Sequence, residues 1–413
     1  MKLFEIYKKF EENEEKLKAY FEEEFRKTPP QLYLSCDLRH SGHKVAVVDT
    51  NLFPAGFNNL CKVFTGQAID AFKNYLSQSR PQARKLLIFA EAHTRNKFYF
   101  ENLSALSDML TQGGFEVRVG SSSPDFPETP YTVSLNGDKT LQIFQVIQEH
   151  GKATLADGWA PDAILSNNDF STGPDPVLQN ISQPVLPSME LGWHRRRKSE
   201  HFRLYNEIAA QVGEMIGLDP WLITCFQASE SSVDLTDPTS LKRLAQTVDD
   251  LLAKIRKKYA EHGIDSSPYV FVKSNSGTYG MGVTYFTSGE EVLTVNRKTR
   301  TKLLSSKGGG KVSEYLIQEG IVTADFYSGY PIEPVIYQVG ETPIGGFFRL
   351  NEEKDEWSSL NTKGMAFSCL CLHKLDQPHE EPFLRCVEKQ TLVKLSYHLT
   401  KIAGLATARE GKI

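Results

Sequence analysis

The stretch from Tyr269 to Val283, which reads YVFVKSNSGTYGMGV, constrains the fold more than any other part of the chain. Its aromatic and β-branched start predicts a buried strand that ends at Lys273. The loop that follows contains three glycines, Gly277, Gly280 and Gly282. Thr284 to Phe286 again has the pattern of a strand. Glycines allow a close backbone approach, and successive N–H groups form anion sites, so this unit predicts a flap over a polyphosphate.

A plain hairpin is the alternative interpretation of this stretch, because short glycine loops commonly join two strands. The loop is not a Walker motif, since no Gly-Lys-Ser/Thr follows and no helix start is visible after Val283. A strand after the loop also argues against a dinucleotide fingerprint, in which a helix follows the glycines.

Length and charge limit the remaining function classes. A chain of 413 residues predicts two large domains or about three smaller ones. A net charge of -4 argues against a broad nucleic-acid surface. No apolar run is long enough for a membrane span, and the N-terminus is charged, unlike a signal sequence. We therefore expect a cytoplasmic protein that binds neither nucleic acid nor membrane.

The cysteines give no sign of a metal site. Cys369 and Cys371 alternate in an apolar run, which favours packing on a strand over metal binding. Reduced thiols are expected in the cytosol. The full set is Cys36, Cys61, Cys225, Cys369, Cys371 and Cys386.

Residues 1–190 predict an open α/β domain. A strand at Leu86 to Ala90, a helix at Lys97 to Gln112 and a strand at Phe115 to Val119 form a β-α-β unit with parallel strands. Before them, an amphipathic helix at Leu3 to Phe25 packs on its own chain or on a second subunit, which leaves a homo-oligomer open. Strands at Gln31 to Leu34 and Lys44 to Val48 are expected to flank a polar turn.

Two polar clusters follow predicted strands in this domain. One contains Asp49, Asn51, Asn58 and Asn59, and the other contains Asn167, Asn168 and Asp169. Ligands of open sheets collect at the carboxyl ends of strands, so the clusters predict a site for amino-acid head groups. An Asx-rich turn is the alternative for the first cluster.

Residues 191–413 carry the cationic part of the pattern. Arg195 to Lys198 stand at the head of a predicted helix, where they oppose the helix dipole unless an anion or an acidic partner is near. A solvated basic turn and a phosphate-facing cluster both remain open. Asp237 predicts the N-cap of a long helix that runs to His262. The strand at Tyr315 to Ile321 ends in Gln318 and Glu319, which suit an adenine edge and a ribose hydroxyl.

A β-hairpin is predicted after this strand. Its predicted strands are Pro334 to Val339 and Gly345 to Leu350, the second of which holds Arg349 and leads to Asn351. Asn361 and Gly364 follow in a turn.

The order of these parts resembles the ATP-grasp ligases, including the glutathione synthetases. Lys198 before an apolar helix, Lys273 before the glycine loop, the QEG strand end, Arg349 in GGFFR and the turn at Asn361 carry the resemblance. More closely, the chain resembles a proteobacterial-type glutamate-cysteine ligase family related to glutathione synthetases. The stretches VDTNLFPAGFNNL, LSNNDFS, GWHRRRKSEHF, KSNSGTYGMGV and EPVIYQVGETPIGGFFRLN prompt this assignment.

The resemblance implies an open α/β N-terminal domain followed by an ATP-grasp-like α+β domain. It implies that ATP and Mg²⁺ drive the joining of the glutamate γ-carboxylate to cysteine through an acyl phosphate. Catalytic roles fall to Arg349, Lys273 and Asn361. Nucleotide contacts fall to Lys198, Lys273, Gly277, Tyr279, Gly280, Gly282, Gln318 and Glu319. Substrate contacts fall to the two polar clusters and Arg196.

One departure concerns the metal. Glutathione synthetases place a Glu-x-Asn metal pair late in the chain, and nothing after Met365 reproduces it. Glu319 and Asn351 are therefore the expected magnesium ligands, with Glu333 and Glu410 as further candidates. A glutathione synthetase and a nucleotide-binding regulatory protein without catalysis remain alternatives.

Overall fold

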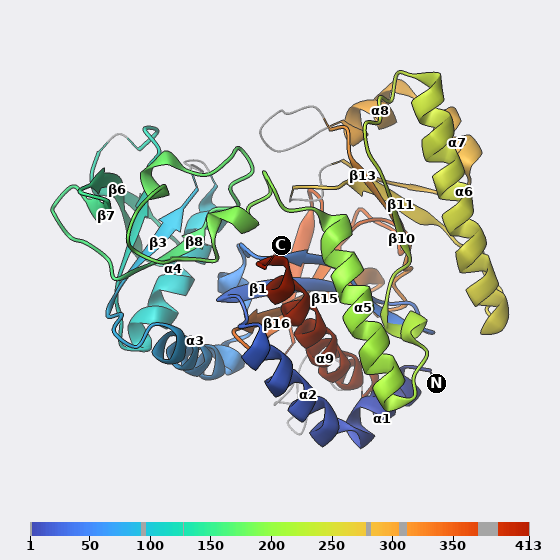
Figure 1. Ribbon diagram of the computed structural model, residues 1–413, viewed down its shortest axis with the longest axis horizontal. Coiled ribbons are helices and arrows are strands. Elements are labelled where there is room, and N and C mark those ends of the chain that lie inside the picture. Colours follow the sequence, from blue (N-terminus) through green and yellow to red (C-terminus); the bar gives the residue numbers. More distant parts are fainter. Residues whose placement is uncertain are drawn as a thin grey trace.

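The computed structural model describes residues 2–91, 96–126, 128–277, 282–304, 312–370 and 387–412. Within these ranges the strands form three sheets, and the helices pack around and between them (Figure 1). The fold is therefore of the mixed α/β class that the sequence predicts. No helix in the described ranges is long and apolar enough to cross a membrane.

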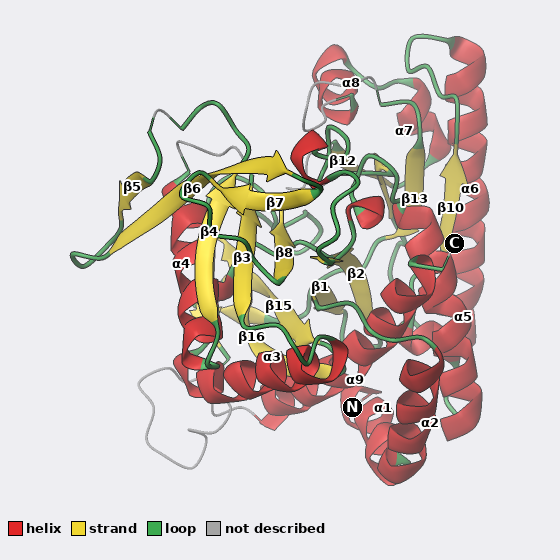
Figure 2. Cartoon of the chain, turned by 60° about the vertical axis from the view of Figure 1, so that its left-hand side comes forward, coloured by secondary structure: helices red, strands yellow, loops and turns green. Residues whose placement is uncertain are grey.

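The parallel sheet confirms the predicted open α/β unit. β3 pairs in parallel with β4 on one side and with β8 on the other. α3 (Thr65–Ser79) and α4 (Lys97–Gln112) lie beside this sheet (Figure 2). Its strands are β3 (Lys85–Ala90), β4 (Glu116–Ser121), β5 (Tyr131–Ser134), β6 (Thr140–Glu149), β7 (Lys152–Leu155), β8 (Ala163–Asn167) and β9 (Val185–Leu186).

A central antiparallel sheet joins strands from both ends of the chain. Its order is β17-β16-β15-β1-β2, with β14 paired to β15. These strands are β1 (Tyr33–His40), β2 (Val45–Asn51), β14 (Phe326–Tyr327), β15 (Tyr330–Val339), β16 (Thr342–Asn351) and β17 (Met365–Cys369). The boundary predicted at residue 190 therefore crosses this sheet. The predicted hairpin is present as β15 and β16.

The polar turn expected after Leu34 is wrong, because β1 continues through Asp37 to His40. Charged residues in this strand mimic a turn in sequence. In the structure they find buried partners on other strands, as described below.

The outer sheet holds the lysine strand and the start of the glycine loop. Its order is β10-β13-β11-β12, all antiparallel. The strands are β10 (Gln227–Glu230), β11 (Val270–Ser274), β12 (Val283–Phe286) and β13 (Tyr315–Glu319). α6 (Pro238–Glu261), α7 (Gly289–Leu293) and α8 (Arg297–Leu303) lie on this side of the molecule (Figure 1). Asp237 caps α6 as predicted, since its carboxylate accepts from the backbone N–H groups of Thr239 and Ser240.

The helix α9 (Val387–Glu410) lies at the centre of the packing. It contacts α1 (Lys2–Glu12), α2 (Glu14–Lys27) and α5 (Lys198–Ile216), as well as β1, β2, β15 and β16. The single N-terminal helix expected from the sequence is two helices, which meet at Asn13. Their apolar faces join the same core as α9, so the stripe packs on its own chain.

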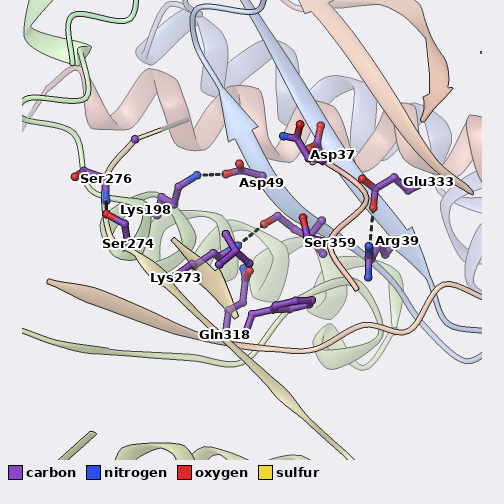
Figure 3. A pocket seen from close by; sticks show the side chains of 15 residues that line it. Asp37, Arg39, Asp49, Lys198, Lys273, Ser274, Ser276, Gln318, Glu333 and Ser359 are labelled. Carbon is purple, nitrogen blue, oxygen red and sulfur yellow. Dashed lines mark hydrogen bonds and ion pairs between the residues drawn. The ribbon is translucent and has the colours of Figure 1, made fainter. Parts of the chain in front are cut away.

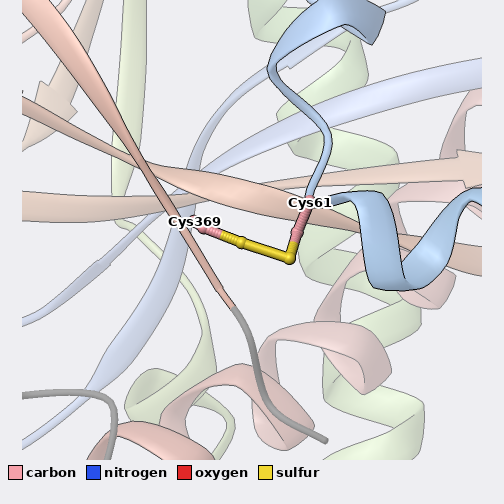
Figure 4. Close-up of a disulfide and its surroundings, with 2 residues drawn as sticks. All are labelled: Cys61 and Cys369. Atoms are coloured by element: carbon pink, nitrogen blue, oxygen red, sulfur yellow. A yellow bond between two sulfur atoms is a disulfide. The ribbon is translucent and has the colours of Figure 1, made fainter. Parts of the chain in front are cut away.

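Two cysteines pair across the chain. A disulfide joins Cys61 to Cys369 (Figure 4). Cys36 and Cys225 are free and buried. The expectation of reduced thiols throughout is therefore wrong for this pair. Sequence spacing gives no sign of it, because the two residues are 308 positions apart. Cys371 and Cys386 lie outside the described residues.

Candidate active site

A cavity of about 640 Å³ lies between the central and the outer sheets (Figure 3). We call it the lysine cavity, after Lys198 and Lys273 in its wall. Its lining comes from β1, β2, β11, β12, β13, β15, the start of α5, the start of the glycine loop and the turn that holds Ser359 and Asn361. The residues are Asp37, Arg39, Val48, Asp49, Lys198, Phe271, Lys273, Ser274, Ser276, Gly277, Val283, Gln318, Glu333, Ser359 and Asn361.

A second cavity of about 840 Å³ lies between the central sheet and the carboxyl ends of β3 and β8. We call it the aromatic cavity. It is lined by Ser35, Asp37, Asp49, Asn51, Phe53, Ala55, Gly56, Asn59, Glu91, Tyr99, Asn167, Asp169, Trp193, Val335, Tyr337, Phe347, Arg349, Asn361, Met365 and Phe367.

The two cavities share Asp37, Asp49 and Asn361 in their walls. A group bound in one cavity can therefore lie next to a group bound in the other. This arrangement suits a transfer between two ligands.

Two lysines converge on Asp49 at the floor of the lysine cavity. Lys198 Nζ lies 2.5 Å from Asp49 Oδ1, and Lys273 Nζ donates to the carbonyl of Val48 at 3.0 Å. Burial lowers the pKa of Lys273 to about 8, although Asp49 partly offsets this effect. Burial alone would raise the pKa of Asp49, but Lys198 and Lys273 lower it below its usual value. The site thus holds an ionised carboxylate beside two cations.

A buried charge network joins β1, β15 and β16 below both cavities. Arg349 contacts Asp37 at 2.6 Å and Glu333 at 2.8 Å. Arg39 contacts Glu333 at 2.7 Å (Figure 3). Asp37, Arg39 and Glu333 line the lysine cavity. Of these three, only Glu333 was expected from the sequence to contact a ligand, as a candidate for magnesium. Charged residues inside otherwise apolar strands were the available signal.

The glycine loop begins as predicted. Gly277 lines the lysine cavity with a φ of +97°, a conformation that L side chains rarely adopt. Gly282 is described but does not line either cavity. Tyr279 and Gly280 lie outside the described residues, so their predicted nucleotide contacts stay predictions.

Most of the other predicted site residues meet at the two cavities. Lys198, Lys273 and Gln318 line the lysine cavity. Six line the aromatic cavity, namely Asp49, Asn51, Asn59, Asn167, Asp169 and Arg349. Asn361 lines both.

Asn58 and Asn168 stand apart from both cavity walls. Asn58 is exposed, and the Asn168 side chain accepts from the backbone N–H of Phe170. Glu91 follows β3 and was not among the predicted site residues, yet it lines the aromatic cavity, where its carboxylate accepts from the backbone N–H of Asp169 at 3.0 Å.

Three predicted ligand contacts are occupied by internal partners instead. Glu319 accepts from Lys44, from the Trp221 indole and from the backbone N–H of Phe226. Both oxygens of this buried carboxylate are used, so a role towards ribose or metal does not fit.

Asn351 and Arg196 are likewise engaged. The Asn351 amide donates to groups of the turn at Leu360 to Lys363 and is fully buried. Arg196 forms an ion pair with Glu410 at 2.6 Å. Neither residue lines a cavity of the site, so their expected metal and substrate contacts do not fit this geometry.

No cluster of three or more His, Cys, Asp or Glu residues suited to a metal ion occurs in the described part of the chain. A magnesium ion that is shared with substrate phosphates needs fewer protein ligands. Asp49 and Asn51 are one residue apart on β2, where alternate side chains point to the same face. Both line the aromatic cavity, where they supply a carboxylate and an amide. They lie near the start of the chain, whereas the metal pair of glutathione synthetases lies late in the chain.

A family model and a solved structure match nearly the whole chain. A protein-family model for glutamate-cysteine ligase (GshA) matches residues 7–411. A crystal structure from Methylobacillus flagellatus KT, assigned as a gamma-glutamylcysteine synthetase, has 33% sequence identity and a TM-score of 0.90. The match covers 100% of this chain and 96% of that one. No curated protein matches the chain.

Two further solved structures are much more distant. A glutathione synthetase-like effector of Globodera pallida has 10% identity and a TM-score of 0.40, covering 86% of this chain and 82% of its own. The D-alanyl-alanine synthetase A of Vibrio cholerae has 10% identity and a TM-score of 0.35, covering 76% and 78%. The assignment rests on the family model and the Methylobacillus structure: the chain belongs to the glutamate-cysteine ligase family.

Proposed function

We propose that the two cavities carry out one ligation, in which ATP activates the γ-carboxylate of glutamate and cysteine then captures the acyl group. The products are γ-glutamylcysteine, ADP and phosphate. The observation that carries this proposal is the meeting of a lysine-lined cavity with an amino-acid-sized cavity at Asp37, Asp49 and Asn361. Use of ATP suits a cytoplasmic location.

The lysine cavity is the proposed ATP site. Gln318 lines it, and the Nε2 atom of this side chain is buried without a partner. A buried unpaired donor is costly, and an acceptor on the adenine edge would satisfy it. Lys198 and Lys273 then stand where the phosphates need cations, and the backbone at Gly277 can approach them closely.

The residues present also fit a magnesium ion. The Asp49 side chain is 33% exposed and ionised, and Asn51 follows on the same face of β2. The Asn51 side-chain oxygen accepts from the backbone N–H of Phe53 at 3.0 Å and keeps a second lone pair for the ion. We assign these two residues as its protein ligands, the remaining ligands being phosphate oxygens and water. The ion would neutralise charge on the phosphates.

The chemistry then follows from the cations and the shape of the site. A γ-carboxylate oxygen of glutamate attacks the terminal phosphorus of ATP, and ADP leaves. The amine of cysteine, which has lost a proton, attacks the acyl carbon, and phosphate leaves. Arg349 borders the aromatic cavity and can stabilise the oxyanion of this second step through its guanidinium donors.

Glutamate and cysteine share the aromatic cavity in this proposal. The end next to β3 and β8 is acidic and amide-rich, through Glu91, Asn167 and Asp169, and suits the glutamate ammonium group. The end formed by Phe347, Met365 and Phe367 is apolar and suits the cysteine side chain, since sulfur packs well against aromatic rings.

ADP release tests the proposal. Purified protein with ATP and Mg²⁺ receives glutamate, cysteine, both, or γ-glutamylcysteine with glycine. Release that requires glutamate and cysteine together supports the proposal. Release only with γ-glutamylcysteine and glycine would assign the site to glutathione synthesis, and no release with any pair would contradict ligation.

A further inference from the structure

Behind the cavities, a buried cluster ties the end of α9 to β2. Glu410 is the last residue of α9, and its two oxygens lie 2.6 Å and 3.2 Å from Arg196 Nε and Nη2. His201 Nδ1 lies 2.5 Å from the same carboxylate. The side chains of these three residues are between 2% and 6% exposed, so water does not compete for the contacts.

Both basic residues reach the same residue of β2. Arg196 Nη1 donates to the backbone carbonyl of Thr50 at 2.8 Å. His201 Nε2 lies 2.9 Å from Thr50 Oγ1. The contacts therefore fix the main chain and the side chain of Thr50 together.

The protonation states of Glu410 and His201 agree with these hydrogen bonds. Burial would raise the pKa of Glu410, but Arg196 and His201 lower it to about 2, so the carboxylate is ionised. Burial lowers the pKa of His201 although Glu410 opposes the effect, so the imidazole is neutral at neutral pH. Nδ1–H then donates to Glu410, and Nε2 accepts from the Thr50 hydroxyl.

Thr50 stands between the two side chains that the proposed function uses. Successive side chains of a strand point to opposite faces, so a Thr50 side chain held on one face directs Asp49 and Asn51 to the other. β2 is an edge strand among the described residues and pairs only with β1. Its position is therefore not enclosed between two strands and needs another support.

Lys198 completes the support from the cavity side. It opens α5, between Arg196 and His201 in the chain, and its Nζ lies 2.5 Å from Asp49 Oδ1. The segment 196–201 thus contacts Thr50 on one face of β2 and Asp49 on the other.

We propose that Glu410 is a positioning residue, which holds Arg196 and His201 on Thr50 and thereby fixes the Asp49 carboxylate and the Asn51 amide where the two cavities meet. The inference rests on the proposed roles of Asp49 and Asn51 in metal and phosphate binding. It gives Glu410 a function at a distance from the reacting atoms.

Glu410→Gln tests the inference, because it removes the charge and keeps the shape. Partners that orient metal ligands commonly account for about 10- to 100-fold in metal affinity or activity. We expect Glu410→Gln to weaken Mn²⁺ binding, measured by electron paramagnetic resonance with a non-hydrolysable ATP analogue, by about 10-fold or more. The Mg²⁺ concentration for half-maximal turnover should rise in parallel, while nucleotide affinity without metal stays unchanged.

Glu24→Gln is the matched control. Glu24 pairs with Arg409, the neighbour of Glu410 on α9, at 2.8 Å, and this contact points to α2 instead of β2. The control removes the ion pair of Arg409 at the same helix end, together with the Glu24 pair to Lys27 on α2, and should leave both metal measurements unchanged.

A second pair of variants, at Thr50, tests the inference even if the Glu410→Gln variant does not fold. Thr50→Val removes the hydroxyl at nearly constant shape and should weaken Mn²⁺ binding, whereas Thr50→Ser keeps the hydroxyl and should restore it. Wild-type Mn²⁺ affinity in folded Glu410→Gln and in Thr50→Val would overturn the inference. Equal losses in Glu410→Gln and Glu24→Gln would also overturn it, since they would indicate general loosening of α9. Failure of the proposed ligation would instead appear in the wild-type protein, as absent γ-glutamylcysteine formation.

Discussion

The lysine cavity and the aromatic cavity are neighbours with opposite chemistry. The first presents Lys198 and Lys273 to its ligand, while the second presents carboxylates and amides around aromatic rings. Both linings span most of the chain, from Asp37 to Asn361 and from Ser35 to Phe367. They differ in that the lysine cavity takes Lys273, Ser274, Ser276 and Gly277 from one short motif.

Burial holds one cation of the first cavity, Lys273, close to deprotonation. Lys273 has a pKa of about 8, well below its usual value of 10.5. An incoming phosphate would restore favourable surroundings for the charge. The amino-acid side instead keeps its one described arginine, Arg349, in ion pairs with Asp37 and Glu333, while the Arg349 Nε is buried without a partner among the described residues.

Lys273→Ala should produce the largest effect and separate the cavities most clearly. Loss of a fixed cation at the transferring phosphate should lower kcat by more than about 100-fold. Amino-acid binding, measured by calorimetry without ATP, should stay unchanged. Lys85→Ala, on β3 away from both cavities, is the control, and near-normal turnover of Lys273→Ala would remove this lysine from the site.

Arg349→Lys should affect both cavities, because Arg349 contacts acids from two strands at their junction. A point charge cannot replace the fork of donors, so we expect kcat to fall about 100-fold. The measurement is steady-state turnover with each substrate varied in turn. Retention of wild-type kcat would show that the oxyanion of the second step is stabilised elsewhere.

The pH dependence should be a property of the lysine cavity alone. Lys273 is charged below its pKa of about 8 and neutral above it. The kcat/KM for ATP should therefore be level below pH 8 and then fall about tenfold per unit. Lys273→Arg should abolish this decline, since a guanidinium stays charged, even if its overall rate is lower. A decline that persists in Lys273→Arg would assign the titration to another group.

Phe367→Ala should give the smallest effect and confine it to the aromatic cavity. Phe367 packs edge-on against Phe347 at 4.9 Å between ring centroids and forms the apolar wall. Loss of this wall should raise the KM for cysteine about tenfold and leave the KM for ATP unchanged. Phe4→Ala, an exposed aromatic residue on α1, provides the comparison. A change in the KM for glutamate instead would reverse the two ends of the cavity.

Local patterns in the sequence predicted several elements correctly. The β3-α4-β4 unit, the Asp237 cap and the strand ending at Lys273 depend on propensity, alternation and capping within a few residues. Gln318 and Lys273 line the same cavity because β13 pairs directly with β11. Such features are recoverable from short stretches, because the forces that produce them act between near neighbours.

The partners of the charged residues could not be predicted from local patterns. Arg196 and Lys198 belong to one basic run, and the sequence alone gives no reason to separate them. The fold places Lys198 on Asp49 in the cavity and Arg196 on Glu410 behind it. Glu319 follows a strand that fits a nucleotide site, yet Lys44 occupies its carboxylate.

The sequence by itself determined the glycine loop with its lysine, the parallel β-α-β unit, the family and the residue types that the chemistry needs. Only the tertiary structure decided which charges face the ligand and which face each other. The physical reason is that a buried charge must find a partner wherever the fold brings one near. Those partners lie far away in the chain, 214 residues for Arg196 and Glu410 and 312 for Asp37 and Arg349, beyond the reach of any local pattern.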